Sequence, residues 1–358
     1  MSLPEPSFWR GRRVLITGHT GFKGGWLSLW LAQFGAYVTG YALPPETGEG
    51  IYAATGVGNA ITPVTGDLRD RTRLRHCIEL MRPDVIFHLA AQAIVRRAHR
   101  DPAGTYQTNV VGTSEVLEAA RHYPFTRAVV VVTSDKVYEN RELAQPFVED
   151  DRLGGNEPYS ASKAAAEILT NAFRANLPDN RLGVATVRAG NVIGGGDWGE
   201  DRLVPDAVRA FRVGRPLDVR NPNSTRPWQH VLDPLCGYIM LAERLVTGDP
   251  IWRTAWNFGA ETSEPVYRLA DQMAEHWNSA GIGHASWGSA ADPNAPYEAT
   301  TLQLDSTRAR SILDWQPRLT LPEAIGWTMD WYTRQAMGEP MYGPTSAMID
   351  SYMGLTPA

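Results

Sequence analysis

Residues 128–136 read Ala-Val-Val-Val-Val-Thr-Ser-Asp-Lys. The apolar run 128–132 is typical of a strand that is buried on both faces, as in a parallel sheet covered by helices. Polarity then changes abruptly to two hydroxyls, a carboxylate and an amine. Open α/β sheets bind ligands at the carboxyl ends of their strands. The stretch therefore predicts a central strand that delivers polar side chains to a ligand site.

Tyr159 and Lys163 follow one loop later, at the start of an alanine-rich stretch that predicts a helix. Side chains four residues apart share one face of a helix. A tyrosine usually titrates near ~10, and the ammonium group of a neighbouring lysine favours the phenolate and lowers its pKa. The spacing alone is a frequent accident on surface helices. With a hydroxyl-bearing strand end close by in sequence, we interpret Tyr159 and Lys163 as an acid/base pair.

Composition excludes several classes of protein. The chain has 358 residues, of which 20% are charged, and its net charge of −5 comes without a basic block, so we expect no nucleic-acid partner. Its two cysteines, Cys77 and Cys236, provide neither a disulfide framework nor a cysteine zinc site, and we expect no metal. The sequence shows no signal-peptide pattern and no apolar run near the ~20 residues of a membrane span. We expect a cytoplasmic protein without a membrane partner.

A glycine-rich turn follows the first predicted strand, residues 12–17, and precedes a helix that starts near Trp26. Glycines let the backbone approach a pyrophosphate, which then lies at the helix N-terminus. The turn therefore predicts a dinucleotide site whose candidate residues are Gly18, Thr20, Gly21, Phe22, Lys23 and Gly24. The second strand, residues 37–43, lacks an acidic residue at its end, so this motif leaves NAD and NADP both open.

Strands alternate with helices through the first half of the chain, which predicts an α/β fold with a doubly wound, Rossmann-type parallel sheet. We expect residues 8–190 to form the dinucleotide-binding domain that carries the catalytic residues. Residues 191–340 should form mainly a smaller C-terminal substrate-binding lobe, with segments that can interleave. Further cofactor candidates at strand ends and helix starts are Asp67, Leu68, Ala90, Ala91, Gln92, Asn109 and Thr133. We interpret His88 as structural.

Residues 226–230, Arg-Pro-Trp-Gln-His, form a cationic and aromatic segment in the second half. The Arg226 guanidinium could bind phosphate oxygens with two N–H groups, and Trp228 could form a wall beside a base or sugar. A surface arginine and a core tryptophan are the alternative interpretation.

Together these motifs resemble the extended short-chain dehydrogenases/reductases of the NAD-dependent epimerase/dehydratase family that act on nucleotide-sugars, and within it the CDP-glucose 4,6-dehydratase branch. The likeness runs from residue 8 to residue 331. It is carried by residues 17–24, 88–92, 133–140, 159–163, 188–198 and 226–230. The related dTDP-glucose dehydratases have an Asp-Glu pair where this chain has Asp135-Lys136, which favours the CDP-glucose branch.

The resemblance implies tightly held NAD and a redox-neutral conversion of CDP-glucose to CDP-4-keto-6-deoxyglucose. Tyr159 would take the proton of the sugar 4-hydroxyl while hydride leaves carbon 4 for NAD. Lys163 would hold Tyr159 as phenolate and bind the nicotinamide ribose. Ser134 would bind the same 4-hydroxyl, a role for which Thr133 is less suited.

The same resemblance assigns the elimination of water to Asp135, a protonated acid that helps the 6-hydroxyl leave. Lys136 is the candidate base at carbon 5, with a merely electrostatic role as the alternative. Asn191 and Arg226 are expected to bind the diphosphate. The full set of substrate-binding residues implied is Gln92, Asn191, Arg202, Leu203, Arg220, Arg226, Gln229, His230 and Tyr297.

Three alternatives stay open at this point. Another nucleotide-sugar 4,6-dehydratase would use the same residues on a different nucleotide. A 4-epimerase would share Ser134, Tyr159 and Lys163 but would not need Asp135 and Lys136 for elimination. A non-catalytic NAD-binding sensor could keep the glycine turn but would not need the tyrosine–lysine pair. For the enzyme we expect a homo-oligomer, either a dimer or a tetramer.

Overall fold

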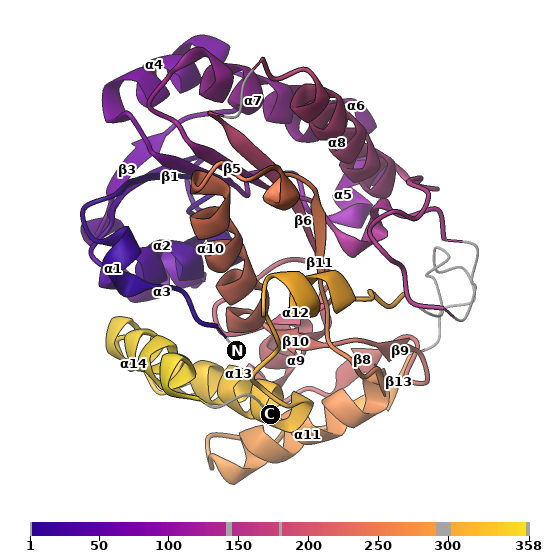
Figure 1. Ribbon diagram of the computed structural model, residues 1–358. Helices are drawn as coiled ribbons and strands as arrows, with labels where there is room; N and C mark the ends of the chain where they lie inside the picture. Colours follow the sequence, from indigo (N-terminus) through magenta and orange to yellow (C-terminus); the bar gives the residue numbers. More distant parts are fainter. Residues whose placement is uncertain (1, 141–144, 179–180, 291–301, 356–358) are drawn as a thin grey trace.

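The computed structural model describes residues 2–140, 145–178, 181–290 and 302–355. A seven-stranded, fully parallel sheet lies at its centre, in the order β11-β6-β5-β4-β1-β2-β3 (Figure 1). The strands are β1 (Arg13–Thr17), β2 (Tyr37–Ala42), β3 (Thr62–Thr65), β4 (Val85–His88), β5 (Ala128–Val132), β6 (Gly183–Ala189) and β11 (Ala255–Phe258). The predicted doubly wound parallel sheet is confirmed.

Helices cover both faces of this sheet (Figure 1). On one face lie α4 (Arg71–Met81), α7 (Gly112–His122) and α8 (Pro158–Ala175), and on the other lie α2 (Phe22–Gln33) and α10 (Leu232–Val246). Successive residues of β5 point to opposite layers: Val129 and Val131 pack into one hydrophobic cluster and Val130 into the other. This alternation explains why β5 consists of consecutive valines.

The chain leaves the sheet after β6 and builds a smaller lobe. Three two-stranded sheets occur there, β10–β7, β12–β9 and β13–β8. The strand β11 returns to the main sheet from beyond residue 190, so this sheet takes strands from both sides of that position. The elements of this half are β7 (Val192–Ile193), α9 (Leu203–Arg212), β8 (Leu217–Val219), β9 (Thr225–Arg226), β10 (Gln229–His230), β12 (Glu264–Pro265), α11 (Val266–Ser279), β13 (Trp287–Ser289), α12 (Thr307–Ile312), α13 (Leu321–Ala336) and α14 (Tyr342–Gly354).

The strand order reverses between β1 and β4, because the chain builds β1, β2 and β3 outward and then returns to the other side of β1. In open parallel sheets this reversal opens a crevice at the carboxyl ends of the strands. The short elements α5 (Val95–Arg100), α6 (Pro102–Tyr106), η2 (Gln107–Val111) and η3 (Asp135–Val137) follow β4 and β5 at that edge, while α1 (Pro6–Trp9), α3 (Ile51–Thr55), η1 (Val57–Asn59) and η4 (Pro250–Trp252) lie elsewhere. No helix within the described ranges is long and apolar enough to cross a membrane.

Candidate active site

The glycine turn between β1 and α2 is tightly packed. Gly18 has a φ of +80°, and a Cβ there would lie 2.7 Å from the backbone nitrogen of Ala90. A Cβ on Gly24 would lie 2.1 Å from the carbonyl oxygen of Gly18. Gly21 is the N-cap of α2 and offers no side chain to the first N–H groups of the helix, so these can bind an anion. Thr20 Oγ1 donates to the Leu43 carbonyl at 3.0 Å, which fixes the turn to the end of β2.

Asp67 and Leu68, also predicted at the cofactor, lie just after β3. The Asp67 carboxylate pairs with Arg69 at 2.6 Å, and this pairing, with its hydrogen bond, holds the carboxyl pKa below its usual value. Leu68 is buried in the hydrophobic cluster beneath α4 and α7. Leu68 therefore offers mainly its backbone to a ligand, whereas the Asp67 side chain stays 27% exposed.

Gln92 and Asn109 are engaged with each other and with the protein. The Gln92 side chain donates to Thr105 Oγ1 at 2.9 Å and accepts from the Ile94 N–H at 2.6 Å. Asn109 lies in the π-helical turn η2, where its side chain accepts from the Gln92 N–H and donates to the Gln92 carbonyl. Asn109 Nδ2 also donates to Ser162 Oγ at 2.9 Å. Both side chains shape the wall that follows Ala90 and Ala91 rather than project from it.

His88 is a structural residue, as the sequence indicated. Its Nδ1 lies 2.7 Å from Thr17 Oγ1 and its Nε2 lies 3.0 Å from Thr113 Oγ1. Because Thr113 Oγ1 donates to the Asn109 carbonyl, it accepts the hydrogen of Nε2, which leaves Nδ1 to accept from Thr17. Burial lowers the pKa of His88 to about 3, in agreement with a neutral ring.

Ser134, Asp135 and Lys136 stand together at the end of β5. Ser134 is the N-cap of η3: its Oγ accepts from the Lys136 N–H at 3.2 Å and donates to Asp135 Oδ1 at 3.0 Å. Asp135 is only 5% exposed, and its Oδ2 has no hydrogen-bond partner among the described residues. Burial raises the pKa of its carboxyl above the ordinary value. Lys136, in contrast, is exposed.

Tyr159 and Lys163 lie on the first turns of α8. The helix begins at Pro158 because the Glu157 carboxylate accepts the N–H groups of Tyr159 and Ser160, and Ser160 Oγ closes the capping box. Lys163 Nζ donates to the Val132 carbonyl at 3.0 Å, which ties the helix to the end of β5.

The electrostatics of this pair differ from the expectation. Burial raises the pKa of the Tyr159 hydroxyl above its usual value, whereas a hydrogen bond with Ser134 lowers it. Burial also lowers the pKa of Lys163 to about 8, with a further decrease from the charge of Lys23. Desolvation is the largest cause of both pKa shifts, and the mutual stabilisation predicted from the spacing is not among the causes of either.

Lys23 and Arg202 bring more positive charge to the same cleft. Burial, and then the charge of Arg202, lowers the pKa of Lys23 to about 8, while Asp135 and Asp197 act in the opposite direction. Arg202 is held by Asp197 at 2.7 Å, and the charge of Asp197 raises the Arg202 pKa.

The other predicted substrate residues fall into two groups. Arg220 lies 3.4 Å from Asp201, Arg226 donates to the Thr225 carbonyl, and the charge of Arg226 acts on Asp135. Leu203 is the first residue of α9, and Asn191 accepts the Gln229 N–H on its backbone carbonyl. These four lie, with Arg202, in the half of the chain that follows β6, at or beside β7, β8, β9 and the start of α9.

Gln229 and His230 are placed differently from the expectation. Gln229 is 2% exposed and its Nε2 donates to the Phe258 carbonyl. His230 is fully buried between the rings of Trp26 and Trp327, and its pKa falls to about 3 by burial. Both side chains are enclosed by other residues of the protein, and their predicted role in substrate binding stays a prediction. The predicted Tyr297 lies outside the described residues.

A buried polar network behind the cleft escaped the sequence analysis. Arg188 Nε and Nη2 donate to both carboxylate oxygens of Glu167 at 2.9 and 2.8 Å. Glu167 also accepts from Thr133 Oγ1 and from Thr186 Oγ1. The signal was present in the sequence, because a charged residue inside the apolar strand 183–189 needs a buried counter-charge. Thr133 is thereby engaged behind the strand, which leaves Ser134 as the hydroxyl on the cleft side.

Comparisons with known proteins place the chain in a family. The GDP-mannose 4,6 dehydratase family model matches residues 15–328. A CDP-glucose 4,6-dehydratase of Salmonella typhimurium is 43% identical over 98% of this chain and 99% of its own length. The chain belongs to the extended short-chain dehydrogenase/reductase family.

Solved structures of extended short-chain dehydrogenases/reductases share this fold. MoeE5 in complex with UDP-glucose and NAD is 27% identical, with a TM-score of 0.74 over 90% of this chain and 99% of its own. A dTDP-glucose 4,6-dehydratase of Bacillus anthracis in complex with NAD is 21% identical, with a TM-score of 0.74 over 92% and 99%. The family is NAD-dependent. The uncapped start of α2 and the tight Gly18–Gly24 turn fit such a dinucleotide.

Proposed function

We propose that this protein is an NAD-dependent CDP-glucose 4,6-dehydratase, which converts CDP-glucose to CDP-4-keto-6-deoxyglucose. The observation that carries the proposal is the site of Asp135: a buried carboxyl with a raised pKa, bonded to Ser134 and followed by an exposed lysine, at the same strand end to which Lys163 is bonded. The full-length relationship to the Salmonella enzyme supports CDP-glucose as the substrate.

Binding and orientation come first. The start of α2 would hold the cofactor pyrophosphate, and Lys163 would contact the nicotinamide ribose. Bound NAD would supply a reversible hydride acceptor, which takes hydride from carbon 4 and returns it to carbon 6. The lobe-side residues Asn191, Arg202 and Arg226 would hold the diphosphate, since guanidinium groups match phosphate oxygens in a two-pronged way.

The first chemical half depends on Ser134, Tyr159 and Lys163. Tyr159 Oη takes the proton of the sugar 4-hydroxyl, and Ser134 Oγ orients that hydroxyl. The neutral phenol favoured by burial must ionise for this step. Lys163 is bonded directly to the end of β5 and its pKa of about 8 keeps it mostly charged at neutral pH, so it can stabilise the phenolate.

The second half depends on Asp135 and Lys136. The 4-keto group acidifies the carbon 5 proton, which Lys136 removes or helps to remove through its charge. Asp135 gives a proton to the departing 6-hydroxyl. A general acid must be protonated when it acts, and the raised pKa of Asp135 supports this role. One buried oxygen of Asp135 has no partner among the residues that the structure describes, which leaves that oxygen for the sugar.

A UDP-glucose 4-epimerase is the second candidate. Such an enzyme from Mycolicibacterium smegmatis is 30% identical over 90% of this chain and 99% of its own. An epimerase also uses a strand-end hydroxyl with the tyrosine–lysine pair, but it removes no water and has no use for a protonated Asp135.

The test is a mass analysis of products after separate incubation with CDP-, UDP-, dTDP- and GDP-glucose. We expect the loss of one water, about 18 Da, from CDP-glucose and not from the others at equal enzyme concentration. An unchanged mass with every donor would contradict the dehydratase. Loss of water from another donor alone would keep the reaction and change the nucleotide.

A further inference from the structure

Tyr138 ends the helical turn that carries Asp135 and Lys136. This turn, η3, is three residues long, and the Ser134 hydroxyl caps it only at its start. So short a turn has little stability of its own. The positions of Asp135 and Lys136 therefore depend on the residues that follow. Val137 is fully buried and its carbonyl accepts the Gly154 N–H at 2.8 Å, and Tyr138 is 3% exposed.

The Tyr138 hydroxyl has one donor and one acceptor, both of them buried. Arg188 Nη1 donates to Tyr138 Oη at 2.6 Å, and Oη donates to Asn257 Oδ1 at 2.7 Å. Asn257 Nδ2 donates to the carbonyls of Phe147 and Asp305, so the amide cannot turn round without losing these bonds. The donor and the acceptor of each hydrogen bond in this series are therefore fixed.

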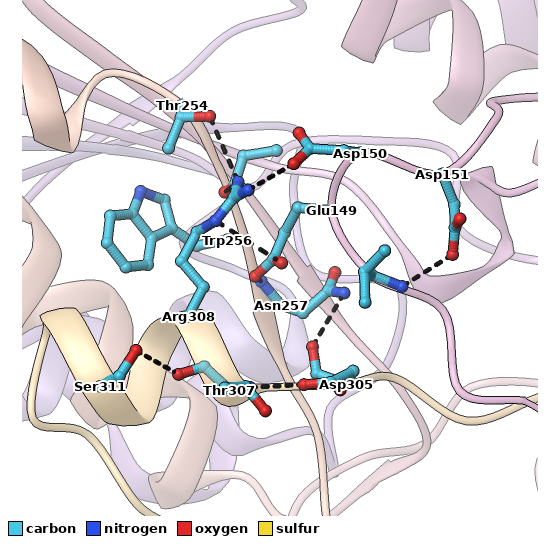
Figure 2. Close-up of polar contacts among 12 residues, drawn as sticks. Glu149, Asp150, Asp151, Thr254, Trp256, Asn257, Asp305, Thr307, Arg308 and Ser311 are labelled. Atoms are coloured by element: carbon cyan, nitrogen blue, oxygen red, sulfur yellow. Dashed lines mark hydrogen bonds and ion pairs between the residues drawn. The ribbon is translucent and has the colours of Figure 1, made fainter.

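Asn257 is itself held firmly. Its backbone N–H donates to Glu149 Oε1 at 2.9 Å, and Arg308 lies 3.7 Å from the other oxygen of Glu149. Arg308 also pairs with Asp150 at 2.7 Å. Figure 2 shows this assembly, with Asn257 between Glu149 and Asp305 and with Arg308 reaching Asp150. The acceptor of the Tyr138 hydroxyl is thus part of a rigid group at the carboxyl end of β11.

Tyr159 and Lys163, the tyrosine–lysine pair of the proposed site, are fixed independently of Tyr138. Lys163 is tied to the Val132 carbonyl, and the Glu157 capping box fixes the start of α8 at Tyr159. Arg188 keeps its two bonds to Glu167 whether or not it binds Tyr138. Loss of the Tyr138 hydroxyl would therefore remove a side-chain anchor of the η3 turn, which keeps its backbone bond from Gly154, while it leaves the tyrosine–lysine pair in place.

We infer that Tyr138 is a positioning residue for the elimination half of the reaction: its hydroxyl holds the turn that presents Asp135 and Lys136 to the sugar. The inference rests on the proposed dehydratase function. It predicts that removal of the Tyr138 hydroxyl slows the elimination of water more than it slows the oxidation at carbon 4.

The experiment uses Tyr138→Phe in the full-length protein with NAD and CDP-glucose. The variant keeps the ring, which stacks on Phe147 with centroids 4.7 Å apart. Formation of the 4-keto sugar should slow only about two- to threefold, because Ser134 caps η3 but Tyr159 and Lys163 keep their own anchors. Elimination should slow by about ten- to a hundredfold, because small displacements of reacting groups cost this much. The readout is the absorbance of reduced nicotinamide during turnover, which should rise well above the wild-type level.

Two further variants separate positioning from general destabilisation. Tyr352→Phe makes the same chemical change at a buried tyrosine of α14, whose hydroxyl donates to Asp233 at 2.9 Å. This variant should leave the absorbance of reduced nicotinamide at the wild-type level. Phe147→Leu removes the stacking but keeps the hydroxyl, and should also show no rise.

Three results would overturn the inference: no rise in Tyr138→Phe, an equal fall of both halves, or a rise in Phe147→Leu but not in Tyr138→Phe. If the wild-type protein removed no water from CDP-glucose, the proposed function would fail instead. The two failures are therefore distinguishable.

Discussion

Asp135 and Glu167 are two buried carboxylates bonded to consecutive hydroxyls of one strand end. Ser134 donates to Asp135 on the cleft side, and Thr133 donates to Glu167 behind the sheet. They are 5% and 2% exposed. Yet the pKa of Asp135 is raised, whereas the hydrogen bonds and charge of Arg188 outweigh burial and lower the pKa of Glu167.

The difference shows that burial alone does not decide the charge of a carboxyl group. Glu167 meets a two-pronged guanidinium and two hydroxyls, so it stays ionised and connects α8 to β6. Within the described part of the chain, Asp135 has one hydroxyl partner and one oxygen without a hydrogen bond, with cations only at longer range, so its proton is favoured. The surroundings of Glu167 suit a structural ion pair, and those of Asp135 suit a group that must donate a proton.

The largest expected effect on turnover comes from the oxidation step, which precedes the proton transfer from Asp135. Tyr159→Phe keeps the ring but removes the group that takes the 4-hydroxyl proton. Turnover of CDP-glucose should fall by more than the ~10²–10⁴-fold typical of a general base, because the same hydroxyl also orients the sugar. Binding of CDP-glucose, measured by calorimetry, should stay within a few-fold. Near-normal turnover would show that another group is the base.

Asp135→Asn should come next, with a loss of turnover of about 10²–10⁴-fold. The amide keeps the shape and can still accept from Ser134, but it has no carboxylic proton to give. Reduced nicotinamide should accumulate on the enzyme after substrate is added, since oxidation is intact and elimination is stalled. If turnover is lost without any reduced cofactor, Asp135 supports the structure and not the elimination.

Glu167→Gln should act on stability. It leaves the Arg188 guanidinium buried without its counter-charge, and breaking such a pair costs about 3–5 kcal/mol. The urea midpoint should fall accordingly. The matched control is Thr186→Val, which removes one hydroxyl from the same carboxylate and should cost about 1 kcal/mol. An equal, small loss in both variants would mean that the ion pair contributes no more than an ordinary hydrogen bond.

The smallest expected effect is on the pH dependence of folding stability, to which Asp135 and Glu167 contribute with opposite signs. Because the folded pKa of Asp135 is raised above 3.8, its contribution to stability is complete below that value and is lost as pH rises through the folded pKa. The melting temperature of Asp135→Asn, relative to that of the wild type, should therefore increase as pH rises. Glu167, with a lowered pKa, contributes above 4.5 and loses this contribution as pH falls through its folded pKa. Parallel melting curves of Asp135→Asn and wild type, from about pH 4 to about pH 9, would contradict the raised value.

The sequence predicted those features that local pattern determines. Residues 128–132 form β5 as expected, and the glycine turn leads into α2, because buried strands and tight turns restrict the residue types. The edge strand β3 was missed, since its exposed residues and Pro63 carry no periodic signal. The strand β11 was missed because its place in the sheet depends on a long-range return of the chain.

In the proposed site, the sequence indicates candidate residues for the chemistry but not the buried residues that hold them in place. Gln229 and His230 lie in a motif with Arg226, but both residues of the short strand β10 are buried, and only the fold shows this. The link between Tyr138, Arg188 and Glu167 joins residues that are up to 50 positions apart in sequence. The predicted decrease of the Tyr159 pKa was wrong in direction for this structure, since spacing does not report desolvation.

The most direct test of the central claim, that Asp135 and Lys136 serve an elimination, traces two hydrogens of CDP-glucose. In deuterated water the product should carry deuterium on carbon 5, because a proton held by a side chain exchanges with solvent. With substrate deuterated at carbon 4, in ordinary water, the label should appear on carbon 6 of the product, since hydride on the nicotinamide does not exchange. A product that keeps its 6-hydroxyl and carries the label only at carbon 4 would contradict the dehydratase and support the epimerase.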